Sequence, residues 1–366
     1  NNTSGSATPT DVDIAALTVK ASPAASDLVI ISDQAASGAW KKVEVSALAS
    51  AGSVASLNGQ TGALAFIAPP QGRLTLQTLT PVMTTTQSAK TTIYYTPHVG
   101  NQIPIYDGTN MVPTAFTELS VATTDATKSP AAIGASKVND WFIWNDSGTI
   151  RIGHGPDWTS DTSRSAGTAL VLVNGIYLNN ASLTNGPAAS RGTYVGTTRS
   201  NASSQLDWII GGSASGGTAA LLNVWNAYNQ VGFAAQITDS GANYTYTSAT
   251  IRQARASSGN QANFVTGLIT EAVQFSNQCY GVNAAVANAN MSWGVGLDST
   301  TAFHQQFNSD SISTASAKRM SGANAGFVTL ASVGYHFIAA LEASDGSNAN
   351  TFNQGSANRL NVLVRC

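Results

Sequence analysis

The residues best suited to acid–base chemistry near neutral pH are four histidines. They are His98, His154, His304 and His336. Only His154 has suggestive company, because Asp157 follows three residues later, as an orienting carboxylate could follow a general base. No nucleophile motif accompanies the pair, and the surrounding glycines and proline favour a surface turn. We therefore expect no catalytic residue and no enzymatic activity.

Motifs that hold metals, phosphates or cofactors are also missing. The glycine-rich stretch Gly211–Gly217 lacks the lysine of a phosphate-binding loop, so we interpret it as a connector. Cys279 and Cys366 are far apart and form no CxxC pair, which favours two free buried thiols over a zinc site or a disulfide framework. The sequence predicts no metal site and no cofactor.

Three aromatic residues are the remaining candidates for ligand binding. Trp158 follows a Gly-Pro turn and precedes a polar stretch, which places it near a surface loop. Tyr244 and Tyr246 alternate along one face of a predicted strand. Exposed rings of this kind can stack on a sugar. The alternative, that all three rings pack inside the protein, stays open.

The composition excludes several classes of protein. Of the 366 residues only 10% are charged and the net charge is −2, whereas a nucleic-acid-binding protein needs clustered lysine and arginine. With 43% hydrophobic residues the chain also differs from a disordered acidic one. Its longest apolar strings are strand-sized, so we expect no membrane insertion. Alanine, serine, threonine, glycine and asparagine together make up more than half of the chain.

Breaks in the pattern divide the chain into five parts. We predict a flexible lead-in at 1–20, a hairpin module at 21–50, a linker rich in glycine and proline at 51–71, a sandwich-like β domain at 72–232 and a C-terminal β domain at 233–366.

Within the two larger parts, short strands alternate with turns, as in β-sandwiches. Asp107–Gly108 and Asn174–Gly175 are suited to tight hairpin turns because they tolerate a positive φ. One segment differs: residues 218–231 place apolar side chains at helical spacing, with Thr218 as a possible N-cap. The expected fold is mainly β with one amphipathic helix packed against the sheets.

So many strands create free edges, which single-chain sheet proteins commonly protect with lysine or proline. The chain has only seven lysines. Partner chains of a symmetric oligomer could cover the edges instead. The sequence therefore favours an oligomer.

Short motifs follow one another along residues 72–343. They are Leu79–Met83, Thr92–Pro97, Ile103–Gly108, Asn145–Thr149, Gly155–Trp158, Val173–Tyr177, Arg191–Thr197, Leu222–Asn229, Gly296–Ala302 and Gly334–His336. Their order resembles a segment of tailed-bacteriophage fibre and tail proteins. Residues 21–50 resemble the hairpin module that opens many phage structural proteins, and Ser56–Gly62 is similar to linkers found after it.

The resemblance implies a homotrimeric virion fibre that is fixed to a tail or capsid protein through residues 1–70. Our leading hypothesis is a tail fibre that attaches the particle to polysaccharide on the host surface. A head fibre or capsid-decorating protein is the alternative. A polysaccharide depolymerase is the weakest hypothesis because carboxylates are sparse. The first residues lack the pattern of a signal peptide, so we expect synthesis in the host cytoplasm and assembly into a virion.

Overall fold

The computed structural model describes residues 24, 26–33, 39–46, 56–57, 60–61, 68–269, 272–286, 289–311, 319–353 and 358–366. The chain forms two units, residues 1–65 and residues 66–366. The division falls inside the stretch 51–71 that the sequence predicts as a linker. The predicted lead-in at 1–20 lies outside the described residues.

The described residues of the first unit form two hairpins. Strand β1 (Leu28–Asp33) pairs antiparallel with β2 (Ala39–Glu44), within the predicted hairpin module. Two short strands follow, β3 (Ser56–Leu57) and β4 (Gln60–Thr61), and they also pair antiparallel.

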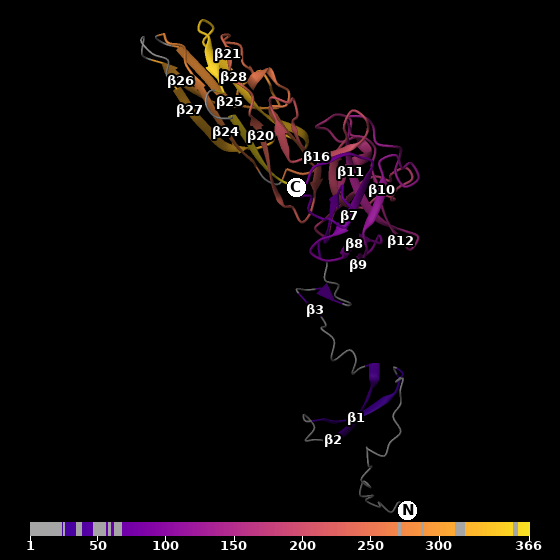
Figure 1. The fold of residues 1–366 in the computed structure, drawn as a ribbon. Helices are drawn as coiled ribbons and strands as arrows, with labels where there is room; N and C mark the ends of the chain where they lie inside the picture. Colours follow the sequence, from indigo (N-terminus) through magenta and orange to yellow (C-terminus); the bar gives the residue numbers. More distant parts are fainter. Residues whose placement is uncertain are drawn as a thin grey trace, which may run out of the picture. The chain divides into compact units, whose positions relative to one another are not determined.

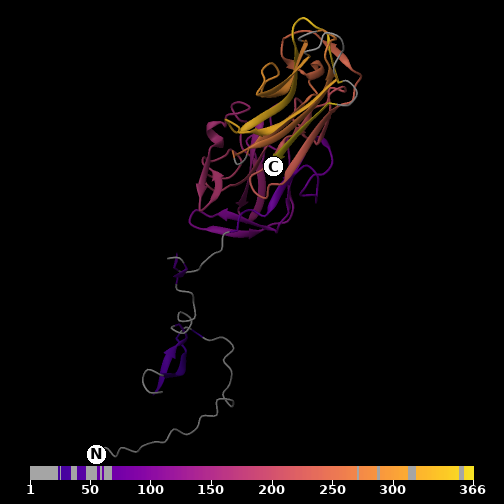
Figure 2. The same cartoon turned by 90° about the vertical axis from the view of Figure 1, so that its left-hand side faces the viewer.

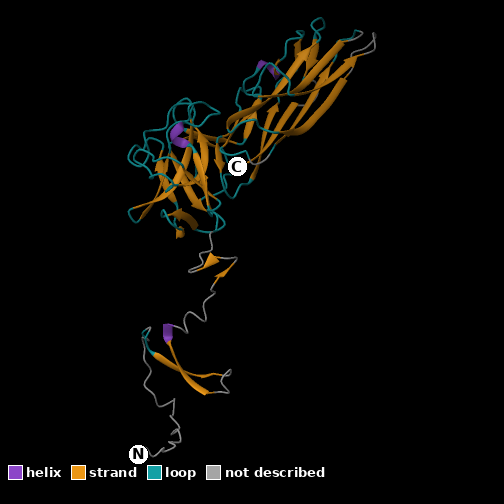
Figure 3. Cartoon of the chain, turned by 180° about the vertical axis from the view of Figure 1, so that it is seen from behind, coloured by secondary structure: helices purple, strands orange, loops and turns teal. Residues whose placement is uncertain are grey.

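The second unit is mainly β, as Figure 3 shows. Its early strands form a six-stranded sheet in the order β12-β11-β15-β14-β13, with β19 beside β15. These strands are β11 (Val138–Asp146), β12 (Thr149–His154), β13 (Leu170–Val173), β14 (Ile176–Asn179), β15 (Thr193–Arg199) and β19 (Val224–Asn226). The first seven residues of β11 are all buried, as expected for a central strand covered on both faces.

Two smaller sheets accompany it. One has the order β10-β7-β5, and the other is the hairpin β8-β9. The strands are β5 (Gly72–Thr75), β7 (Thr92–Pro97), β8 (Gln102–Tyr106), β9 (Met111–Ala115) and β10 (Leu119–Ala122). Gly108 has φ +103° in the turn between β8 and β9. Asn174 and Gly175 have φ +50° and +81° between β13 and β14. Both predicted tight turns are confirmed.

The later strands form a sandwich of two sheets (Figures 1 and 2). One sheet has the order β26-β25-β28-β23-β18-β16-β6, with β22 beside β28. Its strands are β6 (Gln87–Lys90), β16 (Leu206–Ile209), β18 (Ala220–Leu222), β22 (Arg252–Gln253), β23 (Gln261–Thr266), β25 (Ala289–Leu297), β26 (Gln305–Ser311) and β28 (Gly334–Ser344). The other has the order β17-β20-β30-β24-β29-β21, with β27 beside β24; these strands are β17 (Gly211–Ser213), β20 (Gly232–Asp239), β21 (Tyr244–Tyr246), β24 (Val273–Val282), β27 (Arg319–Val328), β29 (Asn350–Phe352) and β30 (Asn358–Arg365).

Alternation of side chains explains the sandwich. In β20, Phe233, Ala235 and Ile237 are buried while the residues between them are exposed. The partner strand β30 follows the same period, with Leu360, Val362 and Val364 inside. Successive side chains of a strand point to opposite faces, so each sheet turns one apolar face inward.

The predicted helix at 218–231 is wrong. Its residues form β18 and β19, and the helical elements in the described second unit are the short 3-10 turns η3 (Ala166–Thr168) and η4 (Ala254–Ala256). Strand β18 lies between β16 and β23, and β19 pairs with β15. Because both faces of these strands are buried, their apolar residues run consecutively, and a short run of this kind does not distinguish a strand from a helix.

Strand pairing also crosses the predicted boundary between residues 232 and 233. Strand β18 pairs in parallel with β23, so the eight-stranded sheet includes strands from both sides of this boundary. The two predicted β domains therefore share a sheet within one compact unit.

One buried arginine joins the beginning, middle and end of this unit. Arg73 on β5 is 2% exposed. Its guanidinium donates to the main-chain oxygens of Pro81 at 2.9 Å and Cys366 at 2.8 Å, and also to that of Asn229. Figure 1 shows the C-terminus lying between the early and the late strands of the unit.

We predict that Arg73→Met destabilises the protein by about 3–5 kcal/mol. Methionine keeps the apolar stem but removes the guanidinium donor from the main-chain oxygens of Pro81, Asn229 and Cys366, of which the last still accepts from the Val231 main-chain nitrogen at 2.9 Å. Urea unfolding at neutral pH measures the change. The control is Arg151→Met, because the Arg151 side chain is 46% exposed; its effect should stay within about 0.5 kcal/mol. Equal effects of the two substitutions would contradict the prediction.

Candidate functional site

Trp158, the first predicted ligand-binding residue, lies inside the protein. It is 1% exposed, and its Nε1 donates to Asp140 Oδ2 at 3.1 Å. The Arg164 guanidinium lies 4.5 Å from the centre of the indole ring. The expectation of a surface indole is wrong, because the turn before Trp158 leads inward to a buried carboxylate.

That carboxylate is the centre of a polar network. Asp140 is 0% exposed and pairs with Arg164 Nε at 2.7 Å. Thr197 donates to its other oxygen at 2.6 Å, and Arg164 also donates to the main-chain oxygen of Gly267 at 2.7 Å. A buried charge needs such partners. The network ties β11 and β15 to the loop before β24.

Tyr244 and Tyr246, the other two predicted residues, lie together on β21 and are half-buried. Tyr244 stacks on Phe352, with ring centres 5.8 Å apart, and the Arg255 guanidinium lies 4.5 Å from its ring centre. The Arg252 guanidinium lies 3.6 Å from the ring centre of Tyr246. Side chains of the same molecule thus lie over the rings on which a sugar would stack, and the ligand-binding role of this pair stays a prediction.

Ion pairs hold the two arginines in place. Arg252 pairs with Glu342 at 2.7 Å and Arg255 pairs with Asp239 at 2.7 Å, and both carboxylates are buried. The Tyr244 hydroxyl donates to Glu342. Burial, and next the charge of Glu342, hold the pKa of Tyr244 well above its usual range. This hydroxyl therefore stays protonated as a donor, which suits a structural role.

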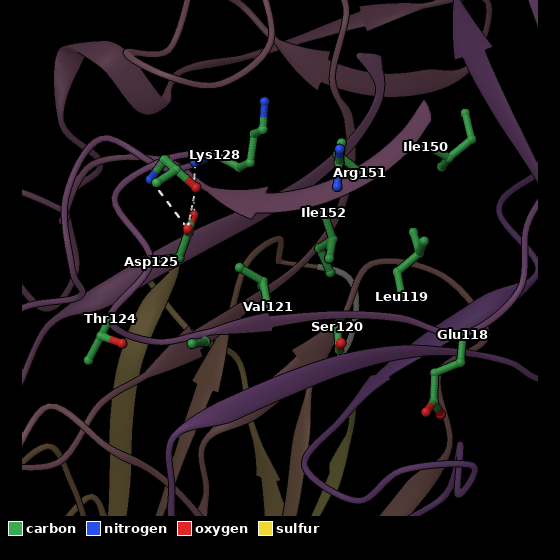
Figure 4. Close-up of a pocket in the computed structure, with 12 residues that line it drawn as sticks. Glu118, Leu119, Ser120, Val121, Thr124, Asp125, Lys128, Ile150, Arg151 and Ile152 are labelled. Carbon is green, nitrogen blue, oxygen red and sulfur yellow. Dashed lines mark hydrogen bonds between the residues drawn. The ribbon is translucent and has the colours of Figure 1, made fainter. Parts of the chain in front are cut away.

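A groove of about 570 Å³ lies between β10 and β12. Figure 4 shows the side chains that line it. In the described part of the chain, β10 and β12 each pair on one side only, so two sheet edges meet there. The aliphatic side chains of Leu119 and Val121 line one side, and Ile150 and Ile152 line the other.

The charges of this groove are already engaged. Lys128 Nζ lies 2.7 Å from Asp146 Oδ2, and Arg151 Nε lies 3.8 Å from the same atom. Burial alone would raise the pKa of Glu118 and of Asp125, but hydrogen bonds lower both. The donors are Thr78, Thr96 and Leu79 for the first, and Thr127 and Lys128 for the second. A general acid needs the opposite shift. The groove offers a contact surface rather than an acid–base pair.

A second hollow of about 480 Å³ opens where the β8-β9 and β11-β12 hairpins meet. Its polar lining comprises Tyr106, Asp107, Asn145 and Arg191, together with Thr114 and Ser147. No sequence motif predicts this hollow as a site, because its residues come from three separate segments. The one available signal is the pair Tyr106–Asp107 at the hairpin turn, which the motif Ile103–Gly108 contains.

Two of the four histidines, His154 and His336, are buried, whereas His98 and His304 are exposed. His154 is 2% exposed at the end of β12, so the predicted surface turn is wrong; its Nδ1 donates to the main-chain oxygen of Gly155 at 2.7 Å. His336 Nδ1 lies 2.8 Å from Asp298 Oδ2, and its Nε2 lies 2.9 Å from the main-chain oxygen of Ser332. Both ring nitrogens of His336 are therefore engaged.

In the part of the chain that the structure describes, no three histidine, cysteine, aspartate or glutamate side chains gather into a metal-binding group. Nor does any described helix have the length and apolar character needed to cross a membrane. Cys279 and Cys366 are buried free thiols.

No protein-family model matches the chain, and no curated protein has significant sequence similarity to it.

We predict that buried His154 makes stability depend on pH. Burial, the largest effect, lowers the pKa of His154 in the folded protein below the usual 6.5. At a pH between the folded and the unfolded pKa, the unfolded chain binds more protons than the folded one, so stability falls as pH falls. Below pH 6.5 the free energy of unfolding of the wild type should fall by up to about 1.4 kcal/mol per pH unit. A series of measurements between pH 7.5 and 5.5 covers this change. His154→Phe should show a shallower slope in urea unfolding. Parallel curves for the two proteins would rule out this role.

Proposed function

We propose that this chain is a non-enzymatic fibre protein of a tailed-bacteriophage virion, most simply a tail fibre that attaches the particle to polysaccharide on the host surface. The observation that carries the proposal is the division of the chain into a small unit with a hairpin and a large sheet-rich unit. This division accompanies the ordered motifs of residues 72–343. Attachment to the particle and attachment to the host are then separate tasks of separate units.

The surface chemistry supports a polysaccharide receptor. Most carboxylates described in the second unit accept hydrogen bonds or form ion pairs within the chain, as Asp140, Asp239 and Glu342 do. Hydroxyl and amide groups are plentiful, and they match the hydroxyl groups of a neutral polysaccharide. Weak sites repeated over several chains gain strength from effective concentration.

The proposed assembly is a homotrimer. Among the strands that the structure describes, β10, β12 and β27 each pair on one side only, so each leaves one edge unpaired. Neighbouring copies of the chain could cover such edges. Light scattering should give three times the 37.6 kDa mass of one chain. A monodisperse monomer would contradict the trimer.

The alternative position, on the head as a fibre or capsid-decorating protein, uses the same unit division. A density map of the intact particle distinguishes the two. A depolymerase would need a general acid, and the lowered pKa values of Glu118 and Asp125 do not favour one in the groove of Figure 4. Release of reducing ends from host polysaccharide would overturn the non-enzymatic proposal.

We predict that the purified full chain competes with the phage for adsorption to host cells. The expected result is fewer adsorbed particles as the chain is added, because both occupy the same polysaccharide. Host cells stripped of capsule and lipopolysaccharide side chains are the control, and they should bind neither. Undiminished adsorption of the phage at a saturating concentration of the chain would count against the proposed receptor. Equal binding of the chain to intact and to stripped cells would do the same.

A further inference from the structure

The second hollow contains the guanidinium of Arg191, which is held in place but forms no ion pair within the described chain. A Cβ added to Gly108 would lie 2.1 Å from Arg191 Nη2 and 2.5 Å from Cζ, so the guanidinium packs directly on the hairpin turn. No described carboxylate lies within ion-pairing distance of it, and its one hydrogen bond within the described chain is a long 3.5 Å contact to the Tyr106 main-chain oxygen. Most of its donors are available to a ligand.

The carboxylate of Asp107 lies in the same hollow and has one oxygen available as an acceptor. Asp107 Oδ1 accepts hydrogen bonds from the main-chain nitrogens of Thr109 at 2.8 Å and Asn110 at 2.7 Å. These bonds, and more weakly the charge of Arg191, lower the pKa of Asp107. The carboxylate is therefore ionised at neutral pH, and its Oδ2 accepts no hydrogen bond from the described residues.

An amide and apolar surface complete the lining. Asn145 Oδ1 accepts from the main-chain nitrogen of Gly148 at 2.6 Å, which leaves the amide nitrogen as a donor. The half-buried Tyr106 ring and the 42% exposed Val112 supply apolar area. The hollow thus presents donors, an acceptor and an apolar wall with a net charge of zero.

We propose that this hollow binds an uncharged pyranose residue of the host polysaccharide. Adjacent sugar hydroxyls donate to Asp107 and accept from Arg191 and Asn145, while the C–H groups of the ring contact Tyr106 and Val112. An acidic sugar would meet the Asp107 carboxylate, and a purely apolar ligand would leave both charges without partners. The volume of about 480 Å³ lies in the range of small-molecule sites. The inference rests on the proposed function and names its ligand class.

The test titrates the full-length chain with neutral disaccharides (maltose, lactose and cellobiose) and with glucuronic acid, by isothermal titration calorimetry or ligand-observed NMR. We expect at least one neutral disaccharide to bind weakly and glucuronic acid to bind more weakly still. Arg191→Ala and Asp107→Asn should each weaken binding roughly tenfold, since each removes a charge-assisted hydrogen bond. Asparagine can keep the Oδ1 acceptor of the turn.

Arg151→Ala is the matched control, because it removes an exposed arginine from the other groove, and binding should stay within about twofold. Thermal unfolding shows that each variant remains folded. Unchanged binding in the Arg191 and Asp107 variants, or stronger binding of glucuronic acid, would overturn the inference. If the wild type binds host polysaccharide but no neutral disaccharide, only this inference fails. If it binds no host polysaccharide at all, the proposed function fails.

Discussion

The large unit depends on how the strand that opens it is held. Strand β5 carries Arg73, whose buried charge is satisfied by main-chain oxygens of Pro81, Asn229 and Cys366. A guanidinium excluded from water needs these partners, so positions 73, 229 and 366 must meet for the unit to form. Two asparagines add to the junction, since Asn226 Oδ1 accepts from the Leu74 main-chain nitrogen at 2.6 Å and Asn229 Nδ2 donates to the main-chain oxygens of residues 70 and 72. The β20-β30 pair continues from the same point.

This junction explains why the segment at 218–231 misled the sequence analysis. Its apolar spacing fits a helix, and nothing within the segment contradicts that interpretation. The decisive partners are far away in the chain: Asn226 bonds to β5, and Trp225 pairs with Thr197 of β15. A helix would give up these contacts with β5 and β15. Local periodicity therefore identified the buried residues, such as Leu222 and Trp225, but could not identify the element.

The same distinction, between local patterns and contacts distant in the chain, separates the features that the sequence predicts from those that it does not. Mainly β architecture, the hairpin at 28–44 and the tight turns at 107–108 and 174–175 follow from alternation and turn chemistry, which are local. Trp158 was misplaced because its burial depends on Asp140 and on Arg164. The second hollow was missed for a related reason. Of the four residues Tyr106, Asp107, Asn145 and Arg191, only the first two are adjacent in sequence, and the other two reach the hollow through the packing of other strands.

The low charge of the chain acquires a more specific meaning from these contacts. Of the few acidic residues, Asp140, Asp239 and Glu342 are buried with arginine partners, and these pairs join segments distant in sequence. Charge is thus used inside the unit for positioning, and a chain with 10% charged residues and a net charge of −2 leaves a surface of low charge. A surface of this kind neither attracts nor repels ionic polymers strongly. Recognition of the proposed polysaccharide then depends on the placement of single groups, and the hollow beside Arg191 is where an available donor, an available acceptor and an aromatic ring occur together.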